Sequence, residues 1–359
     1  MKRIAIVTDV WLESTNGVVS VLKHFKETLE KKGIEVIMVH PGMFGTKIPL
    51  ITYPEIKLAI MTRGTMEQKL SEINPDSIHI ATQGTLGLIA RLACTHKGWK
   101  FTTFYNTQLP TYVNLRFAVV TEEMVFRYLR WFHKPCASTI VATPSMKEFL
   151  ESHGFKNIVV SPFGIDIDLF KRNEKAQVPP DWKKPIFTFL GRVAVEKDIQ
   201  KFLDLDLPGT KVVIGDGPQK AELEEKYYGA AIFTGYKKGQ ELVDLLSVSD
   251  VFVFPSKTDT FGMVVLEAMA CGVPVAAFDV LCPRDIITNG VDGYLGDDLG
   301  KNARACLELD RKDCRKKVLQ YSWDSAGDKF IEHQVSAGMK PPTAIPSAKT
   351  FESIDVAAP

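Results

Sequence analysis

The chain has 359 residues, of which 45% are hydrophobic and 24% charged, the profile of a globular protein with room for about two domains. Lysine and arginine (44) balance aspartate and glutamate (43), so the composition offers no overall positive field for nucleic acid. The six cysteines form no Cys-x-x-Cys pair, which argues against structural zinc and favours reduced thiols in the cytoplasm. No apolar stretch approaches the roughly 18 residues of a transmembrane helix, and the first residues read as a strand rather than a signal peptide. We therefore expect a cytoplasmic protein that at most rests on a membrane.

The first part of the chain alternates strand patterns with helix patterns. Helical periodicity runs over 18–33, 86–98 and 146–154. Apolar runs around these helices predict strands at 4–10, 34–40, 77–82, 101–107, 139–145 and 157–164. Such alternation predicts a parallel sheet covered by helices, in a first domain over residues 1–165.

A second series of the same kind follows a polar, proline-bearing segment, 166–185, which we interpret as a linker. Strand patterns at 186–192, 211–218, 231–235, 250–256 and 273–278 then predict a second domain over 186–322. The end of the chain, 337–359, is predicted to be a disordered tail because it is rich in Pro, Ala and Ser. The expected class is α/β, with two Rossmann-like doubly wound parallel-sheet domains facing across a cleft where ligands bind.

An apolar helix after the strand at 250–256 carries an unexpected charge. The helix is expected to begin near Phe261 and Gly262, so that its first N–H groups face the cleft. Glu267 lies among apolar residues, where an unpaired charge is costly. The vicinal diol of a ribose would satisfy this carboxylate, and so would a neighbouring lysine. Asp259, in the loop before the helix, is placed either to cap the helix or to hold a ligand hydroxyl.

Two other loops at strand ends carry groups suited to phosphate. Arg192 and Lys197 follow the strand at 186–192, and two cations at a strand end suit a diphosphate, although they could also be solvated charges. A glycine turn, Gly215 to Gly217, closes the strand pattern at 211–218. Because all three loops follow strands of one sheet, they predict a pocket for a nucleotide diphosphate that carries a sugar.

Three further motifs have plainer explanations. The turn at 215–220 resembles a dinucleotide fingerprint but lacks its third glycine, and we reject that interpretation. Asp166 and Asp168 imitate a metal-binding Asp-x-Asp, yet they lie in the linker, where a chain turn is favoured. The segment 126–134 (FRYLRWFHK) is either a helix that packs its aromatic residues inward, which we favour, or a membrane-facing patch.

Together the second-domain motifs resemble those of glycosyltransferase family 4, retaining enzymes of the GT-B fold that use nucleotide-sugar donors. Asp259 to Glu267 resembles the E-x7-E motif with Asp in first place, Gly191-Arg192 with Glu196-Lys197 the GR…EK loop, and Gly215 to Pro218 the GxGP turn. The resemblance covers about residues 3–335. It is strongest to a bacterial branch of GDP-mannose-dependent α-mannosyltransferases, related to sulfoquinovosyl and glycolipid transferases.

The resemblance implies a metal-independent transfer of a hexose to a hydroxyl of a glycan or glycolipid, with GDP-mannose favoured over a UDP-sugar and no cofactor. It implies that residues 323–336 form a helix crossing back to the first domain, and that peripheral contact with the inner membrane face is compatible with a lipid acceptor. The implied catalytic residues are Arg192, Lys197 and Asp259. The implied donor-binding residues are Gly17, Gly191, Gly215, Gly217, Thr260, Phe261, Gly262, Met263 and Glu267. The implied acceptor-side residues are Asn16, His79 and Asn106.

One position departs from the pattern. The branch usually has Tyr-His-Thr where this chain has Tyr105-Asn106-Thr107. Asparagine can hydrogen-bond a sugar hydroxyl but does not titrate near neutral pH, which leaves the acceptor and any proton transfer at this position open.

Two rival functions stay open on the sequence. A nucleotide-sugar epimerase of the same fold would need acid–base groups facing the sugar, for which His79 and His153 are the candidates. A catalytically silent nucleotide-sugar-binding protein would fit the presence of Asn106. The base, the exact sugar, the acceptor and the oligomeric state do not follow from these motifs.

Overall fold

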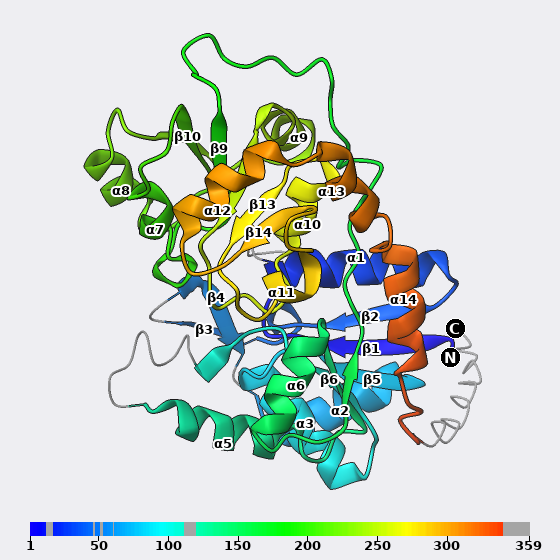
Figure 1. The fold of residues 1–359 in the computed structure, drawn as a ribbon. Helices are drawn as coiled ribbons and strands as arrows, with labels where there is room; N and C mark the ends of the chain where they lie inside the picture. The colour runs from blue at the N-terminus through cyan, green and yellow to red at the C-terminus, as the bar shows by residue number, and fades with distance from the viewer. Residues whose placement is uncertain (12–16, 46, 51–52, 60, 111–119, 340–359) are drawn as a thin grey trace, which may run out of the picture.

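The computed structural model describes residues 1–11, 17–45, 47–50, 53–59, 61–110 and 120–339. Among these residues, two parallel six-stranded sheets form two lobes that lie one above the other in Figure 1. The α/β class with two doubly wound sheets is therefore confirmed. No helix in the described ranges is long and apolar enough to cross a membrane.

The first sheet has the strand order β2-β1-β5-β6-β7-β8. The strands are β1 (Arg3–Val7), β2 (Glu35–Val39), β5 (Ser77–Ile80), β6 (Thr102–Phe104), β7 (Ser138–Val141) and β8 (Ile158–Val160). They are nearly continuous buried runs because helices cover the sheet. These helices are α1 (Gly17–Lys31), α2 (Arg63–Ile73), α3 (Thr85–Lys97), α5 (Glu122–His133) and α6 (Pro144–Ser152).

Threonine hydroxyls define where several of these helices begin. Thr62, Thr121 and Thr143 accept hydrogen bonds from the third helical N–H of α2, α5 and α6. The sequence patterns missed α2, and they also missed an antiparallel hairpin of β3 (Lys47–Leu50) and β4 (Tyr53–Ala59).

The second sheet has the corresponding order β11-β10-β9-β12-β13-β14. Its strands are β9 (Ile186–Leu190), β10 (Thr210–Ile214), β11 (Ile232–Gly235), β12 (Val251–Phe254), β13 (Val275–Ala277) and β14 (Gly293–Leu295). The helices of this lobe are α7 (Gln200–Leu203), α8 (Lys220–Lys226), α9 (Gly239–Val248), α10 (Met263–Ala270), α11 (Pro283–Ile286), α12 (Leu299–Ala305) and α13 (Arg311–Val318). The short 3-10 turns η2 (Val195–Lys197) and η3 (Cys306–Glu308) also belong to this lobe, and η1 (Pro41–Met43) lies in the first. The strand order reverses between β9 and β12, and a crevice at such a point is where doubly wound sheets bind ligands.

The linker is packed rather than free. Residues 166–185 contain no helix or strand, but the side-chain amide of Asn173 donates to Asp244 at 2.7 Å and its backbone N–H donates to Ser247 at 2.9 Å. Asp166 accepts hydrogen bonds from the backbone N–H groups of Asp168 (3.1 Å) and Leu169 (3.0 Å). The Asp-x-Asp sequence therefore makes a chain turn, as favoured above.

The chain returns to the first domain through α14 (Trp323–Glu332), which packs against α1 (Figure 1). The rings of Phe330 in α14 and Phe25 in α1 pack in a tilted arrangement, with 4.8 Å between their centroids. The ordered chain also runs further than expected, because Ala337 is 1% exposed and its backbone N–H donates to Asp76 at 2.7 Å. The predicted tail therefore begins too early; its remaining part, 340–359, lies outside the described residues.

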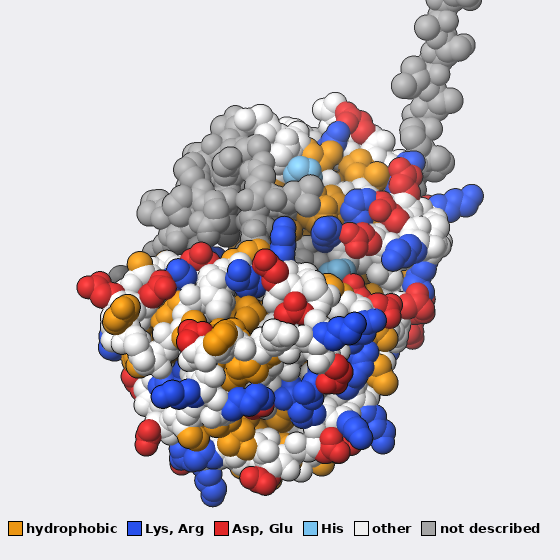
Figure 2. Space-filling model, turned by 90° about the horizontal axis from the view of Figure 1, so that it is seen from above, with side chains coloured by type: hydrophobic (Ala, Val, Ile, Leu, Met, Phe, Trp, Pro, Cys, Tyr) orange, Lys and Arg blue, Asp and Glu red, His pale blue; other side chains and the backbone are white. Residues whose placement is uncertain are grey.

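Charged side chains are mixed over the surface. Figure 2 shows Lys and Arg interspersed with Asp and Glu over the face that it presents. This distribution agrees with the formal net charge of +1.

Candidate active site at the interdomain cleft

Helix α10 begins without a side-chain cap. Its N-cap residue, Gly262, has φ 73° and ψ 55°, and no side chain accepts a hydrogen bond from the first turn. Two constraints favour glycine at position 262. Its φ is positive, and an added Cβ would lie 2.9 Å from Sγ of Cys282. Asp259 does not cap the helix, so that alternative is wrong. The Val265 N–H donates to the Gly262 carbonyl at 2.9 Å, so the N–H groups of Met263 and Val264 are those available to an anionic ligand.

Glu267 lies one turn into α10 and is partly exposed. No hydrogen bond or ion pair reaches its carboxylate from the described part of the chain. Burial raises the pKa of Glu267 to about 7, because the surrounding apolar residues disfavour the charged form. A lysine partner, the plainer explanation of this residue, is therefore not observed.

Asp259 and Lys197 form an ion pair between two loops. Nζ of Lys197 contacts Oδ1 of Asp259, and both side chains are about four-fifths buried, with 20% and 17% exposure. The second carboxylate oxygen, Oδ2, is buried and has no hydrogen-bond partner among the described residues. The pair thus joins Lys197, the cation expected at the diphosphate, to Asp259, the carboxylate expected at the sugar. Oδ2 of Asp259 remains as an acceptor without a partner among the described residues.

The three predicted loops of the second sheet lie together. The backbone N–H of Gly191 donates to Ile214 at 3.0 Å, and a Cβ added to Gly215 would lie 1.9 Å from the carbonyl oxygen of Gly191. These contacts place the loop after β9, with Arg192 and Gly191, directly against the turn that holds Gly215 and Gly217. The hydroxyl of Thr258, in the loop after β12, donates to the Glu196 carbonyl of η2 at 3.0 Å.

The first domain contributes the loop after β6. The Thr260 hydroxyl donates to the Asn106 carbonyl at 2.7 Å, and the side-chain amide of Gln108 approaches the Asp259 carbonyl at 3.4 Å. Nδ2 of Asn106 donates to the Ala81 carbonyl at 3.2 Å, whereas its Oδ1 is buried without a partner in the described chain. Asn106 therefore lies at the interdomain contact that the loop of Asp259 and Thr260 makes with the first domain.

Two interdomain contacts were missed by the sequence analysis. One is Gln108. The other is Asp285 of α11, which accepts hydrogen bonds from the backbone N–H (3.3 Å) and the hydroxyl of Ser145 in α6. No local pattern marks either residue, because each contact joins positions 140 or more apart.

His79 is not brought to the cleft, which corrects its assignment to the acceptor side. It is fully buried in β5, where Nδ1 lies 2.8 Å from the Thr102 hydroxyl and the ring contacts Phe104 and Phe330. Burial lowers the pKa of His79 to about 3, so it is neutral at physiological pH.

Phe261 also has a different place from the one expected. Its side chain is 3% exposed and packs against Phe163 at 5.1 Å and Tyr321 at 6.1 Å between ring centroids. The ring is therefore core between the domains, and only its backbone can serve a donor. Gly17 is the first residue of α1, and Asn16 lies outside the described residues.

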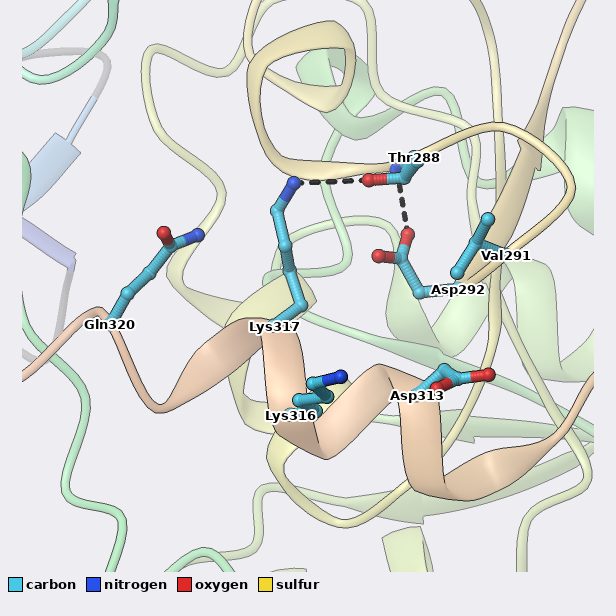
Figure 3. A pocket seen from close by; sticks show the side chains of 7 residues that line it. All are labelled: Thr288, Val291, Asp292, Asp313, Lys316, Lys317 and Gln320. Atoms are coloured by element: carbon cyan, nitrogen blue, oxygen red, sulfur yellow. Dashed lines mark hydrogen bonds between the residues drawn. The ribbon is translucent and has the colours of Figure 1, made fainter.

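A pocket of about 300 Å³ lies elsewhere, between the loop at 288–292 and α13 (Figure 3). Lys317 donates to the Thr288 hydroxyl at 3.0 Å, and the Thr288 N–H donates to Asp292 at 2.7 Å. The lining includes Lys316, Lys317, Asp292 and Asp313, so its charges balance. None of the predicted site residues lines this pocket.

Two family models match successive parts of the chain: Glycosyltransferase Family 4 over residues 15–169 and Glycosyl transferases group 1 over residues 170–305. The chain is a glycosyltransferase of family 4. It is 28% identical over 363 residues to a GDP-mannose-dependent alpha-mannosyltransferase of Mycobacterium tuberculosis, covering 92% of this chain and 96% of the relative. It is 27% identical over 357 residues to the sulfoquinovosyl transferase of Arabidopsis thaliana, covering 88% and 70%.

Solved structures show the same fold. Sucrose-phosphate synthase of Thermosynechococcus elongatus superposes with a TM-score of 0.71 at 18% identity, covering 92% of this chain and 98% of that one. Anabaena HepE in complex with UDP and glucose superposes with a TM-score of 0.68 at 15% identity, covering 92% and 99%. The two sheets of this glycosyltransferase therefore have the GT-B arrangement.

Proposed function

We propose that this glycosyltransferase moves a mannosyl group from GDP-mannose to an acceptor hydroxyl with retention of configuration, the acceptor being a glycolipid or cell-envelope glycan. The observation that carries the proposal is Glu267, a carboxylate that no described residue satisfies, in the helix that follows the loop of the Lys197–Asp259 pair. The choice of GDP-mannose is supported by the mannosyltransferase relative that is similar over 92% of this chain.

Each charged group has a role in this scheme. The carboxylate of Glu267 accepts two hydrogen bonds from the ribose diol, and the open oxygen of Asp259 accepts one from a sugar hydroxyl. Arg192, Lys197 and the first N–H groups of α10 stabilise the charge that develops on the leaving diphosphate. Asn106, on the facing domain, offers its unpartnered Oδ1 to a sugar hydroxyl.

In the proposed chemical step the acceptor hydroxyl attacks the anomeric carbon from the face that the diphosphate leaves. The bond from the anomeric carbon to the phosphate oxygen breaks, its electron pair stays on the diphosphate, and that phosphate oxygen takes the acceptor's proton. No separate carboxylate base is required. Closure of the two domains would exclude water from this step.

The proposal includes no metal ion and no cofactor. Cations and helix N–H groups take the neutralising role that a metal has in other transferases. In the described ranges, no group of three His, Cys, Asp or Glu side chains is arranged to hold a metal. We expect activity to persist in EDTA, and loss of activity that Mg²⁺ or Mn²⁺ restores would contradict this part of the proposal.

A peripheral membrane position in the cytoplasm belongs to the proposal as well. Helix α5 buries Phe126, Leu129 and Phe132 as core residues, yet leaves Met124 and Trp131 55% and 43% exposed. The Arg91 guanidinium lies 3.6 Å above the Trp131 ring. Arg91 itself is buried, and the exposed cation on this face of α5 is Arg127, three residues after Met124 and four before Trp131. An exposed aromatic group beside an exposed cation suits the interface of an anionic bilayer. Trp131→Ala should weaken sedimentation with anionic vesicles, and equal sedimentation would contradict it.

The donor is tested by thermal unfolding with GDP-mannose, GDP, UDP-glucose and UDP, followed by a transfer assay with the donor that binds. A ligand present at 100 times its dissociation constant adds about 2.7 kcal/mol to the stability. We expect stabilisation by GDP compounds that Glu267→Gln reduces, and an α-linked product by NMR. Stabilisation by UDP compounds alone would show that the donor is a UDP-sugar and not GDP-mannose. A chemically altered sugar without transfer to an acceptor would favour an epimerase. Binding of a nucleotide sugar without any turnover would favour a catalytically silent nucleotide-sugar-binding protein.

A further inference from the structure

Arg315 of α13 joins the interdomain linker to helix α10 of the second domain. Its Nη1 donates to the carbonyl oxygens of Ala270 at 2.7 Å and Phe170 at 2.8 Å, and its Nη2 donates to that of Ile167 at 3.1 Å. Ala270 ends helix α10, whereas Ile167 and Phe170 lie in the linker from the first domain. A guanidinium has its donors in a fixed plane, so one side chain holds both segments at a set separation.

At α10, Arg315 completes the carboxyl end of the helix that carries Glu267. The preceding carbonyls already have backbone partners, since Glu267 accepts from the Cys271 N–H at 3.3 Å and Met269 from the Gly272 N–H at 2.9 Å. The last carbonyl, that of Ala270, is bound by Arg315. A cation at this end also interacts favourably with the helix dipole.

At the linker, Arg315 acts just beyond the point where the chain crosses between domains. The backbone N–H of Ile165 donates to the Tyr321 carbonyl at 2.8 Å, and Ile165 bridges Ser322 of the returning chain. The outgoing and returning crossings therefore lie side by side. Two residues after Ile165, the linker is fixed to the second domain by Arg315.

We infer that Arg315 is a positioning residue that couples the interdomain hinge to helix α10. The hinge is the point where the two crossings pair, at Ile165 and Tyr321–Ser322. Through Arg315, α10 and the linker beyond the hinge move as one body when the domains close, so that Glu267 keeps a fixed position relative to the Asn106 loop. The inference rests on the proposed transfer reaction for its catalytic consequence, but the mechanical coupling does not depend on any substrate.

The coupling is tested by amide hydrogen exchange of the full-length protein without ligand. Arg315→Met keeps most of the side-chain length and removes all donors, and Arg315→Lys keeps the charge. Arg304→Met is the matched control, because Arg304 also donates to a backbone carbonyl, that of Asp206 at 2.8 Å, far from the hinge in sequence. We expect Arg315→Met to speed exchange about tenfold both at 271–273 and at 167–171, with partial rescue by lysine and no change at either segment in the control. Faster exchange at only one segment, or at neither, would overturn the inference.

The catalytic consequence is tested with the same variants at a temperature well below unfolding. Arg315→Met should lower kcat about tenfold while the affinity for GDP stays within threefold, because nucleotide contacts are local to the second domain whereas closure is not. An unchanged kcat, or a loss of GDP affinity that equals the loss of kcat, would overturn this role. An inactive wild-type chain would contradict the proposed function and leave the exchange result standing.

Discussion

The two sheets have equivalent strand orders, and each has a carboxylate beside the point where the order reverses, yet the two carboxylates differ in how they are satisfied. In the first domain, Asp9 follows β1 and accepts hydrogen bonds from the Thr82 hydroxyl (2.6 Å) and the backbone N–H groups of Gly84 (2.9 Å) and Leu86 (2.6 Å). In the second domain, Asp259 leaves one buried oxygen without a partner, and Glu267 has no partner among the described residues. A carboxylate that the chain itself satisfies holds the fold, whereas one that the chain leaves open points to a ligand.

The largest expected effect concerns the satisfied carboxylate. Asp9→Ala leaves two buried N–H donors and a hydroxyl unpaired, and each such group costs about 1–3 kcal/mol. We therefore expect the free energy of unfolding, measured in urea, to fall by about 3–6 kcal/mol. A loss below about 1 kcal/mol would show that water replaces these contacts and would remove the contrast with Asp259.

The next effect concerns the cations of the open site. Lys197→Ala and Arg192→Ala each remove a group that stabilises the leaving diphosphate, and turnover should fall by roughly 10²-fold or more. Steady-state kinetics with a saturating acceptor measures this. If the turnover of both variants stays within about threefold of the wild-type value, the two cations do not stabilise the leaving diphosphate.

Glu267→Gln sharpens the comparison on a single variant. The substitution keeps the shape but removes charge-assisted hydrogen bonds worth about 1.5–3 kcal/mol, so donor affinity should weaken about ten- to a hundredfold in titration calorimetry. The protein without donor should unfold at the same or a higher temperature, because a poorly solvated charge is gone. A large loss of stability with unchanged donor affinity would mean that Glu267 is a structural ion-pair partner after all.

The last expected effect is on the pH dependence of stability. The pKa of Glu267 is raised in the folded chain to about 7, above its ordinary value near 4.5, so the folded state holds this proton longer than the unfolded state. The contribution of this group to stability is therefore greatest below pH 4.5 and falls as the pH rises to about 7. Urea midpoints of Glu267→Gln and the wild type should diverge across that window. Parallel curves would show that Glu267 ionises normally.

The sequence predicted those parts of the molecule that depend on local patterns. The paired β strands of both sheets are apolar runs, and Glu267 is conspicuous because it interrupts an apolar helix. The Lys197–Asp259 pair, the Gln108 contact and the Asp285 contact depend on loops that only the folded chain brings together. His79 was misassigned because a histidine in a strand can face a cleft or a helix, and α14, which covers it, lies more than 240 residues later. The hairpin of β3 and β4 was missed although Glu55 to Leu58 alternate between polar and apolar residues, because each strand contains a proline, Pro49 or Pro54, which argues against a strand.

Asp285 gives helix α6 an acidic group at its amino end, although the two belong to different domains. A carboxylate there interacts with the positive end of the helix dipole, typically by about 0.3–1 kcal/mol when it is partly exposed. Opening the domains would separate these charges, and dissolved ions weaken attractions of this kind over a screening length of about 8 Å at physiological salt. Ionic strength should therefore shift the balance between open and closed forms. Solutions of high and low ionic strength would then give this enzyme different access to its substrates.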